Sequence, residues 1–439
     1  MISKGLLTAA YLLIINVFIY HFKWFQFRAF RPWITLLVFN LKFAVGILIW
    51  AVYTFYYTDV ANNDVHKFYR DALTLHDIRA EAPSVFNRLM WGSEITGADK
   101  HKVSALNNWN RHFDEAPVNE NRTIIRMNAW LMFLSFKTYF VHVLFMCLFS
   151  LLGLVLITNS VLRHSPPRTA VLALFVLLLP SLLFWTSGVM KEPLLLLGTG
   201  CFVYGISHLS FTSLQLNPIL ALLFGASIMF ITKFFVLVCL LPATMAFLLF
   251  RNRETVVFIW MKYAIVHVVL LLMAFQVYRI LPGFNLQQML INKQAHSVKE
   301  AEYHRAGSRV EILHLKDDIL SVVCASPSAV FNVIARPLVW ESGNPMMLAS
   351  AVENIFVILF LILCAVYTDW KSPQNLNLFL FLLFSSLAYF TLIGLATPVL
   401  GNLVRYKAPL LPFLLFAFMF RVKPDRVADN FRFALRKEN

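Results

Sequence analysis

Long apolar runs, separated mostly by short polar connections, are the main pattern of this chain. A helix needs about 20 mostly apolar residues to cross a bilayer, and by that measure eleven runs are candidate spans. The predicted spans are Leu6–Phe22, Trp33–Tyr57, Tyr139–Thr158, Thr169–Ser187, Pro193–Ser213, Asn217–Thr232, Phe234–Phe250, Val256–Leu281, Met346–Thr368, Leu376–Gly394 and Val399–Phe420. Two long polar stretches interrupt them, Thr58–Asn128 and Pro282–Pro345. The pattern predicts an all-α fold, a polytopic membrane helix bundle with about 11 transmembrane helices.

The same pattern divides the chain into six segments. They are residues 1–57 with two spans, 58–128 with amphipathic helices in the first long loop, 129–281 with six spans, 282–345 with the second long loop, 346–420 with three spans, and the basic tail 421–439. Within the second loop, Ile319–Ala335 is apolar but has Ser326-Pro327-Ser328 at its centre. This segment predicts an interfacial helix that dips into the outer leaflet.

The composition agrees with a membrane location. The chain of 439 residues is 59% hydrophobic and 14% charged, whereas a soluble domain carries roughly 25% charged residues. The net charge of +15 is not interpreted as nucleic-acid binding, because basic residues in such chains usually mark cytoplasmic loops. The five cysteines indicate neither a disulfide framework nor a metal site, since four of them fall in apolar runs.

The basic residues of the short connections set the predicted orientation. With the N-terminus outside, fourteen of the 38 Lys and Arg residues lie on inner loops and the tail. They are Lys23, Arg28, Arg31, Arg163, Arg168, Arg251, Arg253, Lys371, Arg421, Lys423, Arg426, Arg432, Arg436 and Lys437. The positive-inside rule counts short loops. We therefore predict an N-out, C-in protein with two long extracytoplasmic loops.

Unusual polar residues gather at the outer ends of the predicted spans. Charged groups in or beside spans are costly and are functional candidates for that reason. The candidates are Asp59, Asp64, His66, Tyr69, Lys191, Glu192, Lys233, Arg336, Trp340, Glu341, Arg405 and Tyr406. Alternatives stay open for several of them: an interfacial pair that caps a helix, a lysine that snorkels to the headgroups, or a solvated acidic pair. Lys42, Lys262 and Glu353 are interpreted as structural.

These residue types suit one chemistry on the outer membrane face. Lysine and arginine can bind a lipid-linked phosphate or pyrophosphate, and aromatic faces suit sugar rings and an isoprenoid chain. A carboxylate can deprotonate an acceptor hydroxyl. We choose Asp64 over Asp59 as this base, because Asn63 and His66 can orient it. The set predicts transfer of a sugar from a polyprenyl carrier.

Four motifs carry a resemblance to known membrane proteins. The Asn63-Asp64-Val65-His66 segment, followed by Tyr69, resembles the acidic outer loop of GT-C-type glycosyltransferases, which use polyprenyl-phosphate-linked donors. Arg405-Tyr406-Lys407-Ala408-Pro409 is similar to an element near the end of many such chains. The segment 184–188 with Lys191-Glu192, and the later Arg336-Pro337-x-x-Trp340-Glu341, are similar to elements of bacterial cell-envelope polysaccharide proteins.

The resemblance implies an enzyme of the bacterial inner membrane, a glycosyltransferase or polysaccharide polymerase in cell-envelope glycan synthesis. Its partners would be a lipid-linked sugar donor, a glycan acceptor and membrane lipids, with no nucleic acid. A divalent metal, Mg²⁺ or Mn²⁺, stays open as a cofactor, and no metal ligand is assigned.

Two other classes of function remain open. A transporter or flippase of an anionic lipid-linked substrate would carry buried charges on broken helices near the bilayer midplane, often in repeated halves. Here the candidate charges lie toward one face, and we find no internal repeat. A non-catalytic scaffold subunit would use the nearly neutral long loops, with Trp91, Trp109 and Trp130, to bind a partner.

Overall fold

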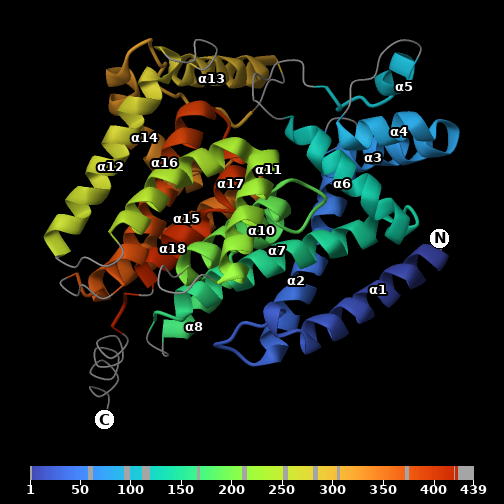
Figure 1. Cartoon of the computed structure of the whole chain (residues 1–439), viewed down its shortest axis with the longest axis horizontal. Coiled ribbons are helices and arrows are strands. Elements are labelled where there is room, and N and C mark those ends of the chain that lie inside the picture. Colours follow the sequence, from blue (N-terminus) through green and yellow to red (C-terminus); the bar gives the residue numbers. More distant parts are fainter. Residues whose placement is uncertain are drawn as a thin grey trace. The chain divides into compact units, whose positions relative to one another are not determined.

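The computed structural model is built from helices connected by short segments (Figure 1). It describes residues 2–57, 63–92, 99–110, 119–165, 169–209, 215–250, 256–279, 285–303, 307–370, 375–419 and 421–423. Within these ranges, extended pairing is confined to two isolated bridges, between Arg309 and Val399 and between Thr368 and Val422. The predicted all-α class is confirmed.

Seven helices of the described ranges are long and apolar enough to cross a membrane. These stretches are Lys4–His21, Pro32–Tyr56, Tyr139–Leu162, Leu216–Leu249, Phe258–Gln276, Pro345–Tyr367 and Leu376–Ala396. They belong to α1 (Ile2–His21), α2 (Pro32–Ala51) with its π-helical end (Val52–Tyr56), α7 (Tyr139–Leu162), α11 (Leu216–Leu249), α12 (Val256–Gln276), α15 (Pro345–Tyr367) and α16 (Leu376–Ala396). Six predicted spans agree closely with these helices, and two more share α11.

Three predicted spans differ from the structure because the backbone breaks or the helix is short. The predicted span Thr169–Ser187 consists of α8 (Ala170–Leu177) and α9 (Pro180–Trp185). The last predicted span consists of α17 (Leu400–Lys407) and α18 (Leu411–Met419). Proline has no N–H and does not continue a helix, which explains the breaks before Pro180 and at Pro409. The described part of the fifth span is the 17-residue α10 (Glu192–His208).

Helix α11 contains a break at Lys233, between the predicted spans Asn217–Thr232 and Phe234–Phe250. Lys233 has φ −150° and ψ 84°, which is not helical, and it separates two helical stretches of this 34-residue element. A break of this kind leaves nearby backbone carbonyls without their usual partners in the helix. Thr123 supplies one replacement, because its hydroxyl donates to the carbonyl of Ile231 at 2.8 Å.

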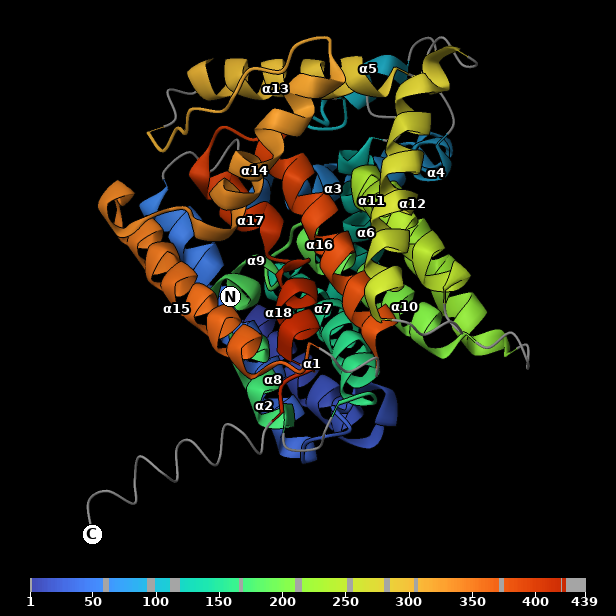
Figure 2. The same cartoon turned by 90° about the vertical axis from the view of Figure 1, so that its left-hand side faces the viewer.

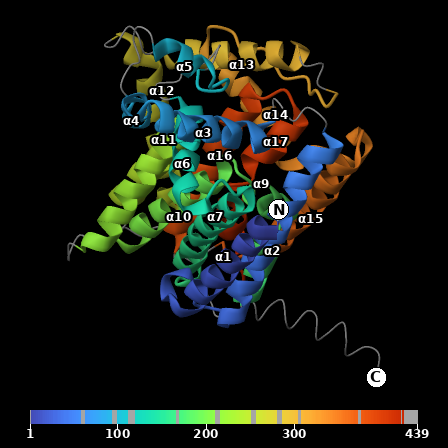
Figure 3. The ribbon, with the colours of Figure 1, turned by 90° about the vertical axis from the view of Figure 1, so that its right-hand side faces the viewer.

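The described residues form two compact units, and the first contains residues 1–157, 183–205 and 209–234. In this unit α3 (Asp64–Glu81) packs against α4 (Pro83–Trp91) and α6 (Glu120–Ser135), as Figure 3 shows. One face of α3 is buried through Val65, Phe68, Ala72 and Leu75, at the three- and four-residue spacing of an amphipathic helix. The short α5 (Lys100–Ser104) lies in the same loop. These helices lie in the stretch Thr58–Asn128 that the sequence predicts as the first long loop, and α6 continues beyond it.

Close backbone contacts hold α7 and α10 together inside the first unit. A Cβ atom on Gly200 would lie 2.3 Å from the carbonyl oxygen of Gly153. A Cβ on Gly46 of α2 would lie 2.8 Å from the carbonyl oxygen of Ser187. Small residues allow helices to approach in this way within membranes. The segment after α9 is therefore fixed against α2.

The second unit contains residues 158–182, 206–208 and 235–439, and α16 is its central helix. Helices α12, α14 (Ile319–Ala335) and α18 pack against it (Figure 2), and so does α13 (Leu286–Tyr303). A Cβ on Gly394 would lie 2.3 Å from the carbonyl oxygen of Ala329, so α14 and α16 are in direct backbone contact. The bounds of α14 agree with the predicted interfacial helix.

Candidate functional site

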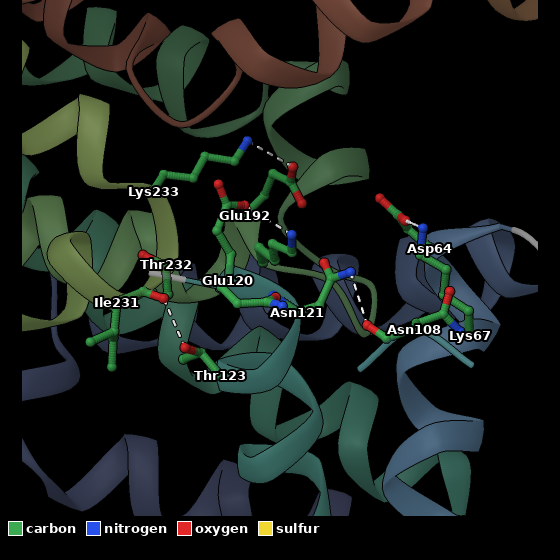
Figure 4. Close-up of polar contacts among 12 residues, drawn as sticks. Asp64, Lys67, Asn108, Glu120, Asn121, Thr123, Glu192, Ile231, Thr232 and Lys233 are labelled. Atoms are coloured by element: carbon green, nitrogen blue, oxygen red, sulfur yellow. Dashed lines mark hydrogen bonds and ion pairs between the residues drawn. The ribbon is translucent and has the colours of Figure 1, made fainter. Parts of the chain in front are cut away.

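Two buried ion pairs lie at the end of the segment between α9 and α10 in the first unit. Residues 186–191 are all buried, although they are not helical. At the end of this segment, the Lys191 ammonium lies 2.9 Å from a carboxylate oxygen of Glu120 on α6. The next residue, Glu192, lies 3.3 Å from the ammonium of Lys233, at the break of α11 (Figure 4). All four side chains are less than one-tenth exposed.

Local structure explains why Glu192 and Lys233 occupy these places. Glu192 is the first residue of α10 and precedes Pro193, a residue that favours the first turn of a helix. A carboxylate there interacts favourably with the positive end of the helix dipole. Lys233 sits at the break of α11, so a charged side chain occurs where the apolar helix is already interrupted. The pair joins two irregular points of the backbone.

Asp64 lies at the beginning of α3. Asn63 caps α3, because its side-chain oxygen accepts a hydrogen bond from the backbone N–H of His66 at 3.1 Å. Asp64 forms an ion pair with Lys67, and its side chain remains 22% exposed. The Lys67 and Lys191 ammonium groups lie 5.1 and 5.3 Å from the centre of the Phe68 ring.

The first unit thus holds three ion pairs, Asp64–Lys67, Glu120–Lys191 and Glu192–Lys233. Each pair joins one carboxylate and one ammonium group, so its formal charge is balanced. Figure 4 draws the residues of these pairs in one close-up. Four predicted site residues, Asp64, Lys191, Glu192 and Lys233, are members of these pairs. Each of the three lysines already contacts a carboxylate of the chain.

His66 and Tyr69 of α3 are both engaged with neighbouring segments. The His66 Nε2 atom lies 3.0 Å from the Thr54 hydroxyl. That hydroxyl donates its proton to the carbonyl of Trp50, so the histidine N–H is the donor. Burial lowers the pKa of His66. The Tyr69 hydroxyl donates to the carbonyl of Lys137 at 2.8 Å, and burial raises the pKa of Tyr69 to about 12. Both side chains are therefore neutral at neutral pH.

Several further buried polar residues of the first unit were not predicted. Asp71 of α3 accepts a hydrogen bond from the backbone N–H of Asn108 at 2.7 Å, which fixes the loop before α6. His142 lies 2.7 Å from the Ser135 hydroxyl and 2.8 Å from the Asn128 side-chain oxygen, across the corner between α6 and α7. The sequence pattern gives no sign of these partners.

In the second unit, the segment before α15 contains a second charged pair. A guanidinium nitrogen of Arg336 lies 2.8 Å from a carboxylate oxygen of Glu341. The other carboxylate oxygen of Glu341 accepts a hydrogen bond from the backbone N–H of Leu338, also at 2.8 Å. Trp340, between them in the sequence, is 82% exposed. These three predicted residues share one tight turn.

Asn354 connects this turn to the end of α17. Its amide donates to the carbonyls of Ala335 and Pro337, and its oxygen accepts from Lys407 at 2.6 Å. Lys407 is almost fully buried, whereas the preceding Arg405 and Tyr406 are half-buried. The Arg-Tyr-Lys segment is thus anchored by its lysine. The sequence pattern predicts Arg405 and Tyr406 as site residues and does not include Lys407.

The predicted residues therefore fall into two sets. The first unit holds Asp64, His66, Tyr69, Lys191, Glu192 and Lys233, and the second holds Arg336, Trp340, Glu341, Arg405 and Tyr406. Asp59 lies outside the described residues. Within the ranges described, no three His, Cys, Asp or Glu side chains are placed to hold a metal ion. Comparison of the chain with protein-family models, curated proteins and solved structures finds no match.

Proposed function

We propose that the protein is an integral-membrane glycosyltransferase, or polysaccharide polymerase, that uses a polyprenyl-phosphate-linked sugar donor. The observation that carries this proposal is the position of Asp64. It is a partly exposed carboxylate, fixed at the first turn of α3 by the Asn63 cap and by Lys67. The neighbouring Tyr53, Tyr139 and other aromatic residues pack around Val65, the next residue of the same helix.

In the proposed reaction Asp64 acts as the general base. The acceptor hydroxyl gives its proton to the Asp64 carboxylate while its oxygen forms a bond to the anomeric carbon of the donor sugar. The bond between that carbon and the phosphate oxygen breaks, and the polyprenyl phosphate leaves as the anion.

The proposed setting is the inner membrane of a bacterium, with both long loops on the outer side. Eleven spans with the N-terminus outside give the short inner connections most of their basic residues, as the positive-inside rule requires. The break of α11 at Lys233 supports counting its two stretches separately. In this arrangement the α3 segment with Asp64 lies on the outer side, where a lipid-linked donor would be used.

An Asp64→Asn variant tests the catalytic proposal directly. Asparagine keeps the shape of the side chain but cannot accept the proton, so the rate of sugar transfer should fall about 10²- to 10⁴-fold. Asp77→Asn is a matched control, because Asp77 lies on the same helix and also forms an ion pair with a lysine, Lys137. The assay combines purified protein with a polyprenyl-phosphate sugar and an acceptor, with and without Mg²⁺ or Mn²⁺. Equal rates for the two variants would refute the role of Asp64.

A second candidate function is transport of an anionic lipid-linked substrate. The break of α11 at Lys233, with its buried contact to Glu192, favours it, because transporters often place charged groups at interrupted helices. Vesicles containing the purified protein and a fluorescent lipid-linked anion would test this function. A transporter should lose flipping in Lys233→Met and keep it in Asp64→Asn, whereas an enzyme should lose sugar transfer in Asp64→Asn.

A further inference from the structure

Lys42 is a fully buried lysine in the first unit, and no ion pair to it is found among the described residues. It lies in the middle of α2, and its ammonium donates to the hydroxyl of Thr186 at 2.6 Å. Among the described residues, no carboxylate lies within ion-pair distance of this ammonium. Lys191 and Lys233, by contrast, each contact a glutamate.

An ammonium group in this position has unused bonding capacity. It carries three N–H donors, and a buried charge is unfavourable unless an opposite charge or several hydrogen bonds compensate it. Thr186 satisfies one donor with a neutral oxygen. Lys407 in the second unit is comparably buried but donates to two oxygens, those of Val333 and Asn354. Lys42 is therefore suited to an additional, negatively charged acceptor.

The surroundings of Lys42 also suit an anion. Thr186, Ser187 and Gly188 form the start of the buried segment between α9 and α10, which offers hydroxyl groups and no acidic side chain. The thiol of Cys147 donates to the carbonyl of Ser187 at 3.5 Å, on the α7 side of this segment. The apolar stretch Pro32–Tyr56, in which Lys42 lies, is long enough to span a membrane. Moving an anion from water to the middle of an apolar helix costs free energy. We expect this cost to be smallest for an anion attached to a lipid chain, because the chain itself stays in the hydrocarbon.

We propose that Lys42, with Thr186, binds the phosphate of an isoprenoid phosphate. This inference rests on the proposed use of a lipid-linked donor and assigns the donor phosphate to a residue that the sequence suggested was structural. It also separates two roles for the lysines of the first unit. Lys191 and Lys233 hold the buried segment through their glutamates, while Lys42 at its start contacts the ligand.

Binding of farnesyl phosphate to the purified full-length protein in detergent tests this assignment. Isothermal titration calorimetry would compare the wild type with Lys42→Met, Lys42→Arg and, as a control, Lys262→Met. Lys262 is a half-buried lysine in the apolar helix α12 and contacts the ring of Phe250. We expect about 10- to 100-fold weaker binding for Lys42→Met, because one charge-assisted hydrogen bond is lost. Lys42→Arg should recover part of the affinity, and Lys262→Met should bind like the wild type.

Two further ligands identify the source of the phosphate. Farnesol lacks the charge, and inorganic phosphate lacks the lipid chain, so both should bind much more weakly than farnesyl phosphate. Equal binding of farnesol, or binding of inorganic phosphate with the full affinity, would overturn the proposal. If Lys42→Met does not fold, Thr186→Val replaces it and should weaken binding in the same direction.

The outcome is distinguishable from failure of the catalytic proposal. Affinity that depends on Lys42 supports the phosphate site even if Asp64→Asn leaves sugar transfer unchanged. Unchanged affinity in both Lys42→Met and Thr186→Val refutes the phosphate site even if Asp64 proves to be the base.

Discussion

Removing the charge of Glu192 is expected to destabilise the protein strongly. Glu192 is completely buried, and its carboxylate lies 3.3 Å from the ammonium of Lys233, which is also buried. Glutamine has nearly the same shape, so Glu192→Gln removes the charge and little of the packing. The variant leaves the positive charge of Lys233 in a buried place without the carboxylate that it contacts.

The size of the effect follows from the burial of both partners. Removing one partner of a buried ion pair typically costs about 3–5 kcal/mol, mainly because the remaining charge stays out of water. Lys233→Met should cost a similar amount by leaving the Glu192 carboxylate buried. The double variant Glu192→Gln/Lys233→Met should regain most of the lost free energy of unfolding, since replacing both charges of a buried pair is often close to neutral.

Denaturation of the purified protein in detergent, followed by tryptophan fluorescence, measures these differences. Asp77→Asn is the control, because Asp77 pairs with Lys137 at the surface, and pairs of that kind contribute about 0–1 kcal/mol. The reasoning is wrong if Glu192→Gln is no less stable than Asp77→Asn. It is equally wrong if the double variant is less stable than both single variants, because the pair would then stabilise the fold by itself.

Two further predictions concern the orientation of the chain and a buried carboxylate. Cysteines introduced at Asn108 and Asp429 should be labelled by an impermeant maleimide from the outside and the inside, respectively, and outside labelling at 429 would refute the N-out, C-in topology. Burial raises the pKa of Asp71, although hydrogen bonds from Asn108 oppose this shift. The folded state therefore holds the Asp71 proton more tightly than the unfolded state, and this contribution is lost as the pH rises through the raised pKa. Asp71→Asn should thus gain stability relative to the wild type as the pH rises above the ordinary Asp pKa of 3.8. Denaturation midpoints of the two proteins that differ by the same amount at every pH would contradict the shift.

Hydropathy predicted the helices well and their interruptions only in part. The predicted spans Met346–Thr368 and Leu376–Gly394 agree with α15 and α16 to within two residues at each end. The break at Lys233 was predicted because a charged residue interrupts an apolar run. The break between α8 and α9 was missed, because a hydropathy average over about 20 residues does not register that Pro180, within a mostly apolar run, stops the preceding helix.

The partners of the candidate residues could not be read from the sequence. Glu120 lies 71 positions before Lys191, in a loop helix whose place beside the buried segment depends on tertiary packing. Glu120 lies in the first turn of α6, and the sequence pattern does not say which element that turn faces. Asp64 was chosen because its sequence neighbours Asn63 and His66 can orient it. In the structure Asn63 caps the helix that Asp64 begins, a feature that depends only on neighbouring residues.

The balance of charge changes how the lysines of the first unit are interpreted. Counting cations near the outer face treats Lys191 and Lys233 as phosphate ligands and interprets Lys42 as structural. Once Glu120 and Glu192 are assigned to the first two, an incoming phosphate would have to displace a carboxylate that is already buried with its lysine. In such an exchange one buried carboxylate loses its lysine for each phosphate that is bound, so the net gain in binding free energy is small. An anion at Lys42 displaces no charge, and for this reason the residue that seemed structural is the stronger candidate for binding phosphate.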